Sequence, residues 1–213
     1  MLGPIKSYDD FMEVTMARHD NHAWWQTSVI YQIYPRSFYD ANNDGIGDLQ
    51  GIAAKLDYLC DLGIDAIWLS PVYQSPMYDF GYDISDYRRI DPAYGELADF
   101  TRLLKEARAR HIRIIMDLVV NHTSHVHAWF KDARTSRDNP RRDWYIWHDG
   151  HHGNPPNNWK AAFGGNAWEW DEATRQFYLH SFLPQQPDLN WRNADLRQAV
   201  KNEMQYWLDL GVD

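Results

Sequence analysis

Apolar residues form three short, nearly continuous runs along the chain, at residues 29–34, 64–70 and 112–120. Runs of this length, rich in β-branched and aromatic residues, are typical of strands that are buried on both faces of a parallel sheet. Between the runs, apolar residues recur at helical spacing over residues 52–63 and 97–107. The alternation of strand and helix predicts an α/β fold, and a (β/α)8 barrel and a doubly wound sheet both satisfy it.

This alternation breaks over residues 121–193, which are rich in proline, glycine and asparagine. The segment is too long for an ordinary loop, and residues 168–170 and 176–180 have the pattern of a hairpin. We interpret it as a small subdomain inserted after the third strand. The predicted organisation is a poorly ordered leader (1–23), three β/α units (24–120), the insertion (121–193), and a helix followed by the start of a fourth strand (194–213).

The last residues repeat a pattern found earlier in the chain. Residues 58–65, Tyr-Leu-Cys-Asp-Leu-Gly-Ile-Asp, are echoed by residues 206–213, Tyr-Trp-Leu-Asp-Leu-Gly-Val-Asp. In the first copy the glycine ends a helical pattern and a strand pattern follows directly. We therefore expect a fourth strand to begin at the second copy, and we interpret the sequence as the N-terminal portion of a longer barrel. A coincidental helix-end pattern is the alternative.

Composition narrows the classes of partner. Lys and Arg total 21 against 30 Asp and Glu, a formal net charge of -9, so the chain lacks the basic excess typical of nucleic-acid-binding proteins. The single cysteine, Cys60, excludes an intramolecular disulfide, and residues 1–28 lack the apolar segment of a signal peptide or membrane anchor. These features favour a cytoplasmic protein without a membrane partner. Aromatic residues make up 15% of the chain, and many lie in polar segments where flat rings suit stacking on sugars.

Residues 40–48 place oxygen-bearing side chains at alternating positions with Gly45 at the sixth, a spacing that wraps a loop around a hard cation. The twelfth position is Gly51 instead of the glutamate of an EF-hand, and no helix pattern precedes the loop, so an EF-hand sensor is disfavoured. We predict a calcium or magnesium site; a turn whose carboxylates face water is the alternative. The predicted ligands are Asp40, Asn42, Asp44 and Asp48, with the Ile46 carbonyl as a further ligand.

Two polar segments follow the second and third predicted strands. Residues 117–122, Asp-Leu-Val-Val-Asn-His, lie at the carboxyl end of the most apolar strand, where barrel enzymes build their active sites. An aspartate in such a strand is costly unless it is paired or functional. Residues 79–87 interleave carboxylates with aromatic rings, as a sugar pocket requires. The alternatives are an ordinary polar loop and a structural histidine.

Five motifs occur together over residues 24–213: residues 32–38, the acidic loop to residue 48, Gly-Tyr-Asp at 81–83, residues 117–122, and Gln-Pro-Asp-Leu-Asn-Trp at 186–191. In this order and spacing they resemble the α-glucosidase and oligo-1,6-glucosidase branch of the α-amylase superfamily, glycoside hydrolase family 13. The resemblance implies the N-terminal part of a (β/α)8 barrel instead of a doubly wound sheet. It also implies that the insertion after strand three is the B domain of that family.

The resemblance further implies retaining hydrolysis of terminal α-glucosidic bonds in short α-glucoside oligosaccharides, with the acidic loop as a structural calcium or magnesium site. It implies that the catalytic nucleophile and acid/base lie beyond Asp213, so that the 213-residue chain alone is inactive. A trehalose synthase-type glucosyl isomerase and a non-catalytic sugar-binding or metal-binding relative are the alternatives. By the resemblance, the terminal glucose is surrounded by Asp79, Tyr82 and His122, with Phe163, Phe182 and Gln186 from the B domain, and Asp117 orients the active-site network.

Overall fold

The computed structural model describes residues 22–213, in which three parallel strands form one sheet. The strands are β1 (Ile30–Ile33), β2 (Ala66–Leu69) and β5 (Arg113–Met116), hydrogen-bonded in the order β1-β2-β5. Their register aligns Ile30 with Ala66 and Ala66 with Arg113. All three strands were predicted, although β5 ends at Met116, four residues before the predicted end. The predicted leader lies outside the described residues except for its last two positions.

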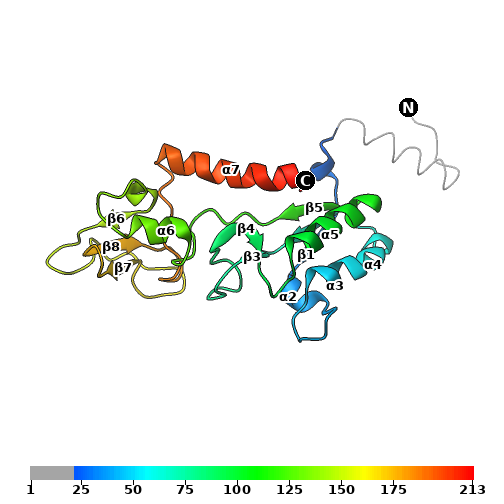
Figure 1. The fold of residues 1–213 in the computed structure, drawn as a ribbon, viewed down its shortest axis with the longest axis horizontal. Coiled ribbons are helices and arrows are strands. Elements are labelled where there is room, and N and C mark those ends of the chain that lie inside the picture. Colours follow the sequence, from blue (N-terminus) through cyan, green and yellow to red (C-terminus); the bar gives the residue numbers. More distant parts are fainter. Residues whose placement is uncertain (1–21) are drawn as a thin grey trace, which may run out of the picture.

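Helices cross over between the strands, as the apolar spacing predicts (Figure 1). The first crossover is split into α3 (Leu49–Ala54) and α4 (Leu56–Asp61) by Lys55, whose φ of -104° and ψ of 6° end the first helix. The second crossover is the continuous helix α5 (Leu97–Ala109). Their apolar faces and the strands form the barrel core, which includes Ile33, Leu49, Ile52, Leu56, Ile67, Leu69, Phe100, Leu103 and Ile114.

Several short elements were not predicted. A 3-10 helix η1 (Trp24–Gln26) precedes β1, and α2 (Pro35–Phe38) follows it with the proline at the first helical position, where its missing N–H costs nothing. The chain between β2 and α5 forms an antiparallel pair, β3 (Tyr73–Gln74) and β4 (Asp86–Ile90). This pair fixes both ends of the loop that carries residues 75–85.

The insertion has its own sheet and its own apolar cluster. After α6 (Ala128–Ala133) and η2 (Arg142–Trp144), it contains β6 (Trp147–His148), β7 (Trp168–Asp171) and β8 (Gln176–Leu179), in the antiparallel order β6-β8-β7. The β7–β8 pair confirms the predicted hairpin. Isolated backbone bridges join His122 to Asp188 and Tyr145 to Leu189, so the first and last parts of the insertion lie side by side. The insertion core comprises Phe130, Ala133, Trp144, Tyr145, Tyr178, Leu189, Leu196 and Val200.

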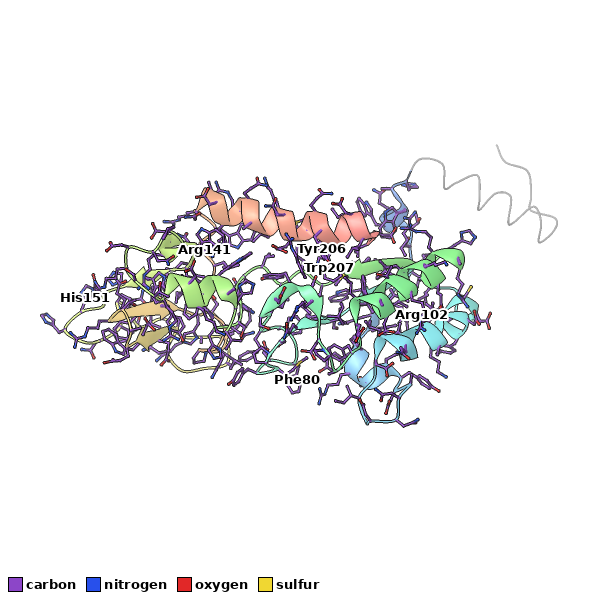
Figure 2. The ribbon with its side chains drawn as sticks, viewed as in Figure 1. Phe80, Arg102, Arg141, His151, Tyr206 and Trp207 are labelled. Carbon is purple, nitrogen blue, oxygen red and sulfur yellow. The ribbon has the colours of Figure 1, made fainter. Side chains whose placement is uncertain are left out.

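Helix α7 (Ala194–Leu210) returns from the insertion to the barrel and extends over both of them (Figure 1). Its first turns bury Leu196 and Val200 in the insertion core. Near its other end Trp207, labelled in Figure 2, packs against Phe100 at 5.2 Å between ring centroids and donates from Nε1 to the Tyr87 carbonyl at 2.8 Å. One helix therefore belongs to both cores.

The residues after α7 lie beside β5. Gly211 ends the helix in the left-handed conformation with φ +107°, which favours glycine. Asp213 then donates from its backbone N–H to the Ile114 carbonyl at 3.0 Å, and its carboxylate accepts from the Ile114 N–H at 3.1 Å. Within residues 22–213, every helix is too short or too polar to span a lipid bilayer.

The histidine at the N-cap of α6 should make the stability of the protein depend on pH. His127 Nδ1 accepts from the Trp129 N–H at 3.0 Å, and burial, with a contribution from Arg141, lowers the pKa of His127 to about 3. Because this lies below the unfolded value of about 6.5, the stabilisation is complete above that pH and is lost as the pH falls toward 3. We expect protonation linked to His127 to lower the free energy of unfolding by about 3 kcal/mol as the pH falls from 7 to 4.

His127→Asn retains a side-chain acceptor at the N-cap but does not titrate. Urea unfolding of both proteins at pH 7, 6, 5 and 4 should therefore show a smaller loss of stability in the variant. Parallel pH profiles for the two proteins would contradict this assignment.

Candidate active site

The residues assigned to a sugar pocket lie on three segments that meet at the carboxyl ends of the strands. Asp117 directly follows β5, and its backbone N–H donates to the Leu69 carbonyl at the end of β2 at 3.1 Å. The β3–β4 loop carries Asp79, and the bridge at His122 brings in the last part of the insertion. Active sites of α/β barrels are built at this end of the sheet.

The β3–β4 loop is held from inside by Asp83, which is fully buried. Its Oδ1 accepts from Ser75 Oγ at 2.9 Å and from the Asp79 N–H at 3.0 Å, and its Oδ2 accepts from the Tyr78 N–H at 3.1 Å. Gly81 allows the loop to turn with φ +102°. The buried carboxylate thus fixes the backbone from which the Asp79 side chain projects.

Gln186 connects the insertion to this loop. Its Nε2 donates to Asp79 Oδ2 at 2.9 Å and lies 3.0 Å from His122 Nε2, while its Oε1 accepts from the Leu183 N–H at 3.0 Å. The side chain is fully buried, with both ends of its amide engaged within the protein. Gln186 therefore positions Asp79 and His122 relative to each other, which is more than the predicted contribution to the pocket lining.

His122 is 4% exposed and is held on both sides of its ring. Its Nε2 lies 3.1 Å from the Tyr82 carbonyl and its Nδ1 lies 3.2 Å from Asn121 Nδ2. Burial lowers the pKa of His122 below its ordinary value, although the hydrogen bond to Tyr82 and nearby carboxylates oppose this. The imidazole is therefore neutral at neutral pH.

Two phenylalanines continue the site away from His122. The Phe182 ring packs edge-on against the His122 ring at 5.2 Å, and the Phe163 ring packs against Phe182 at 5.9 Å. Phe163 is 62% exposed, and the adjacent backbone is tied to the same segment because Ala162 donates to the Ser181 carbonyl at 2.8 Å. The result is an apolar wall beside the polar group formed by Asp79, Gln186 and His122.

Asp117 and Tyr82 lie close together at the end of β5. Burial raises the pKa of the Asp117 carboxyl, with a hydrogen bond from the Trp68 side chain acting in the opposite direction. Burial also raises the pKa of the Tyr82 phenol, and the negative charge of Asp117 adds to that effect. The structure thus brings all seven predicted pocket residues to one region, while their roles toward a substrate stay predictions.

The acidic loop lies apart from this region, between α2 and α3. Asp40 Oδ2 accepts from the Gly45 N–H at 2.8 Å, Asp44 Oδ1 accepts from the Ile46 N–H at 2.8 Å, and Asp48 Oδ1 caps α3 by accepting from Gly51 at 2.6 Å. Hydrogen bonds from the loop backbone, chiefly that of Gly45, lower the pKa of Asp40. In the described part of the chain, no three His, Cys, Asp or Glu side chains converge to hold a metal ion.

The donor set of this loop nevertheless suits a hard cation. Among residues 22–213, no Lys or Arg forms an ion pair with Asp40, Asp44 or Asp48, so three carboxylates in nine residues are uncompensated. Each carboxylate oxygen has lone pairs beyond those engaged by the backbone. Calcium and magnesium prefer such oxygen ligands.

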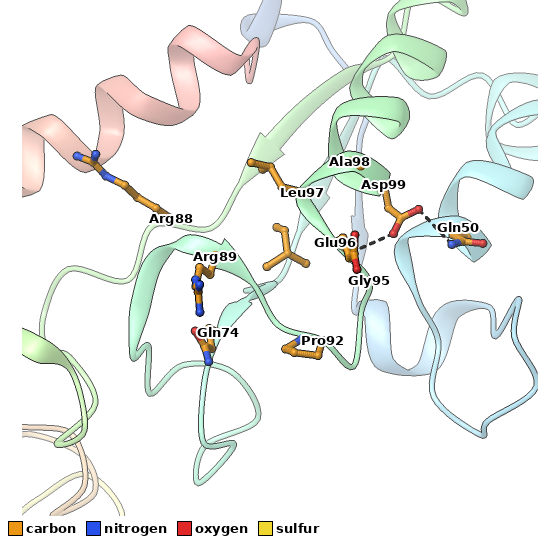
Figure 3. A pocket seen from close by; sticks show the side chains of 11 residues that line it. Gln50, Gln74, Arg88, Arg89, Pro92, Gly95, Glu96, Leu97, Ala98 and Asp99 are labelled. Carbon is orange, nitrogen blue, oxygen red and sulfur yellow. Dashed lines mark hydrogen bonds between the residues drawn. The ribbon is translucent and has the colours of Figure 1, made fainter.

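A broad open cavity of about 950 Å³ lies elsewhere, between β4 and the start of α5 (Figure 3). Asp99 is hydrogen-bonded there to Gln50 Nε2 at 3.1 Å and to the Glu96 N–H at 3.0 Å. Its lining, as described for residues 22–213, includes none of the predicted pocket residues and no aromatic ring. We assign the candidate active site to the converging polar network and not to this larger space.

Sequence reasoning missed the residues that support the site. Asp83 was noted only within its motif, and neither Asn121 nor Asp188 was assigned a role. Asn121 Nδ2 donates to Asp188 Oδ1 at 3.0 Å, and the same oxygen accepts from the Ser181 N–H at 2.9 Å. A buried charged residue within a Gln-Pro-Asp motif was the available signal, because such a group needs donors around it.

The hydrogen bonds of Asp83 lead to a testable prediction. Asp83→Ala leaves the backbone N–H groups of Tyr78 and Asp79 without their acceptor, so we expect the free energy of unfolding to fall by about 2–4 kcal/mol. Asp86→Ala is the control, because its carboxylate is 44% exposed, accepts only from the Arg88 N–H at 2.9 Å among the backbone groups of the described residues, and has an ion pair with Arg89 that is 4.0 Å long. Urea unfolding should show a loss below about 1 kcal/mol for the control; equal losses in the two variants would argue against the structural role of Asp83.

Comparison with known proteins places these features in a family. The chain matches the family described as alpha amylase, catalytic domain, over residues 32–213. It is 61% identical over 191 residues to an oligo-1,6-glucosidase of Heyndrickxia coagulans and 58% identical over 190 residues to one of Parageobacillus thermoglucosidasius. Each alignment covers 89% of this chain and 34% of the relative.

A solved isomaltulose synthase from Protaminobacter rubrum is also similar, with a TM-score of 0.89 and 53% identity over 90% of this chain and 34% of that one. The chain thus spans about a third of the length of these relatives. The family match covers most of the chain, and the parallel order β1-β2-β5 agrees with it. The chain therefore belongs to the α-amylase family of glycosidases, and its strands are the first three of a (β/α)8 barrel.

Proposed function

We propose that the full-length protein hydrolyses terminal α-glucosidic bonds of short oligosaccharides with retention of configuration. The observation that carries this proposal is the network in which Gln186 joins Asp79 to His122 beside the Phe182 ring. Carboxylates and imidazoles bind sugar hydroxyls, and aromatic rings stack on sugar faces. Two similar proteins are named oligo-1,6-glucosidases, which supports short α-glucosides as substrates.

In this proposal, Asp79, Tyr82 and His122 surround the terminal glucose. The Asp79 carboxylate accepts hydrogen bonds from sugar hydroxyls, because only one of its oxygens is used by Gln186. Phe182 and Phe163 form the apolar side of the pocket. Asp117 lies at the end of β5 beside the Tyr82 phenol and orients the polar groups around the glucose. Such a combination of rings and fixed polar groups is typical of small-molecule sites.

Retaining hydrolysis requires two carboxyl groups about 5–5.5 Å apart, one as nucleophile and one as acid and then base. We propose that both lie outside residues 1–213, as the resemblance implies. The chain contributes substrate binding and positioning in this scheme. A polypeptide of residues 1–213 alone should then show no turnover of p-nitrophenyl α-glucoside, whereas the full-length protein should release p-nitrophenol.

Glucosyl transfer to a sugar acceptor is the second candidate. It is favoured by the similarity to an isomaltulose synthase at 53% identity. Hydrolysis and transfer share the covalent intermediate and differ in whether water or a sugar hydroxyl attacks it. Incubation of the full-length protein with sucrose or maltose, followed by product chromatography, separates the two: free glucose supports hydrolysis, and an isomeric disaccharide supports transfer.

The aromatic wall provides a mutational test of the pocket. In the full-length enzyme, Phe182→Ala should lower kcat/KM about tenfold or more while changing the melting temperature little, because the ring contacts the pocket and lies outside the buried cores. Phe177→Ala is the matched control, since Phe177 is buried in the β7–β8 hairpin. It should lower the melting temperature and leave kcat/KM intact; a reversed pattern for the two variants would refute this assignment of Phe182.

We also propose that the acidic loop binds one calcium or magnesium ion through Asp40, Asn42, Asp44, Asp48 and the Ile46 carbonyl. A bound divalent ion would offset two of the three negative charges of the loop and hold it between α2 and α3. Isothermal calorimetry on the full-length protein should detect one site, and Asp44→Ala should weaken binding at least tenfold because one charged ligand is lost. Asp61→Ala, an exposed carboxylate on α4, is the control. Unchanged affinity in Asp44→Ala would exclude the loop as the site.

A further inference from the structure

Asp188 is a buried carboxylate that contacts no predicted pocket residue through its side chain. It is 6% exposed, and three donors surround it. Its Oδ1 accepts from Asn121 Nδ2 at 3.0 Å and from the Ser181 N–H at 2.9 Å, and its Oδ2 accepts from Ser181 Oγ. An ionised carboxylate has no hydrogen to donate, so each of these neighbours must present one to it.

This requirement determines the orientation of the Asn121 amide. Because Asp188 needs a donor, the Asn121 nitrogen and not its oxygen faces the carboxylate. The same nitrogen, with its second hydrogen, lies 3.2 Å from His122 Nδ1. A ring nitrogen that faces an N–H group must offer a lone pair. The proton of the neutral imidazole is therefore on Nε2.

The other side of the ring agrees with this assignment. His122 Nε2 lies 3.1 Å from the Tyr82 carbonyl, which can only accept. The Nε2–H tautomer satisfies this carbonyl and the Asn121 amide and leaves the second hydrogen of Gln186 Nε2 without an acceptor on the ring, whereas the Nδ1–H tautomer satisfies Gln186 alone. Two hydrogen bonds against one favour the first tautomer by about 1 kcal/mol.

We propose that Asp188 is a positioning residue that, through Asn121, holds His122 in the Nε2–H tautomer, so that Nε2–H donates to the Tyr82 carbonyl and the ring is fixed beside the sugar bound at Asp79. This inference rests on the proposed function for the identity of the sugar. The tautomer itself is independent of that function. Without the Asp188–Asn121 pair, His122 samples both tautomers and loses its hydrogen bond to the Tyr82 carbonyl for part of the time.

The first test is a pair of variants in the full-length enzyme. Asn121→Ala removes the bridge at an exposed position, so the fold should tolerate it. We expect kcat/KM toward p-nitrophenyl α-glucoside to fall about tenfold, the rate equivalent of one lost neutral hydrogen bond. In the His122→Ala background the same change should have no further effect, because the residue through which it acts is absent. Equal losses in both backgrounds would show a merely structural role and overturn the proposal.

The second test separates hydrogen bonding from charge at position 188. Asp188→Asn can keep its oxygen toward Asn121 and donate from its nitrogen to Ser181 Oγ, so it should retain kcat/KM within about threefold. Asp188→Ala should lose as much as Asn121→Ala. Asp171→Asn is the control, since Asp171 is an equally buried carboxylate of the insertion that pairs with Arg134 at 2.5 Å, away from His122. Its effect should be confined to the melting temperature.

A spectroscopic readout makes the proposal independent of activity. In the full-length protein with 15N-labelled histidine, the His122 signals are assigned by their loss in His122→Ala. Nδ1 should resonate as an unprotonated nitrogen in the unaltered protein and in Asp188→Asn, and it should shift toward a mixture of tautomers in Asn121→Ala. A protonated Nδ1 in the unaltered protein would refute the inference, whether or not the enzyme cleaves α-glucosides. A correct tautomer without such cleavage would refute only the proposed function.

Discussion

The hydrogen bond between Gln186 and Asp79 is the constraint on which the candidate site depends. It joins two residues that are 107 positions apart, one on the insertion and one on the barrel loop. Because the Gln186 amide is fully buried, water cannot replace a lost partner, and leaving either end of the amide unpaired would cost about 1–3 kcal/mol. This hydrogen bond therefore helps to fix the position of the insertion relative to the barrel loop. The positions of the pocket residues on the two segments depend on it.

The two sides of that bond are supported by different buried carboxylates. Asp83 holds the barrel loop by accepting from backbone N–H groups, and Asp188 holds the end of the insertion in the same way through Ser181. Neither needs a cationic partner, since several hydrogen bonds compensate a buried carboxylate much as an ion pair does. The side chains that would face a substrate are thus attached to backbone segments that buried carboxylates hold in place.

The sequence predicted the barrel strands well because their signal is local. Runs of β-branched residues located β1, β2 and the start of β5, and helical spacing located α5 and α7. The division of the first crossover at Lys55 had no such signal, because its conformation there depends on packing of the two short helices. The strands β3 and β4 were missed for other reasons: β3 has only two residues, and β4 contains Asp86, Arg88 and Arg89, so it lacks the continuous apolar run that marks the barrel strands.

The sequence predicted only those residues of the site that belong to a recognisable family motif. Resemblance named Asp79, His122 and Gln186, and the structure brings them together. It could not reveal that Asn121 lies between His122 and Asp188, because that contact joins positions 67 apart and depends on which atom of an amide faces which neighbour. Hydrogen-bond polarity is a property of the folded arrangement, and no spacing of residues encodes it.

Helix α7 has a consequence for how the molecule unfolds. Leu196 and Val200 belong to the insertion core and Trp207 belongs to the barrel core, and both groups are on one continuous helix. Neither core can open without exposing part of a helix that the other core still needs. Amide hydrogens in the β7–β8 hairpin and in β5 would therefore exchange with solvent through shared opening events, so that the two cores behave as one cooperative unit despite their separate sheets.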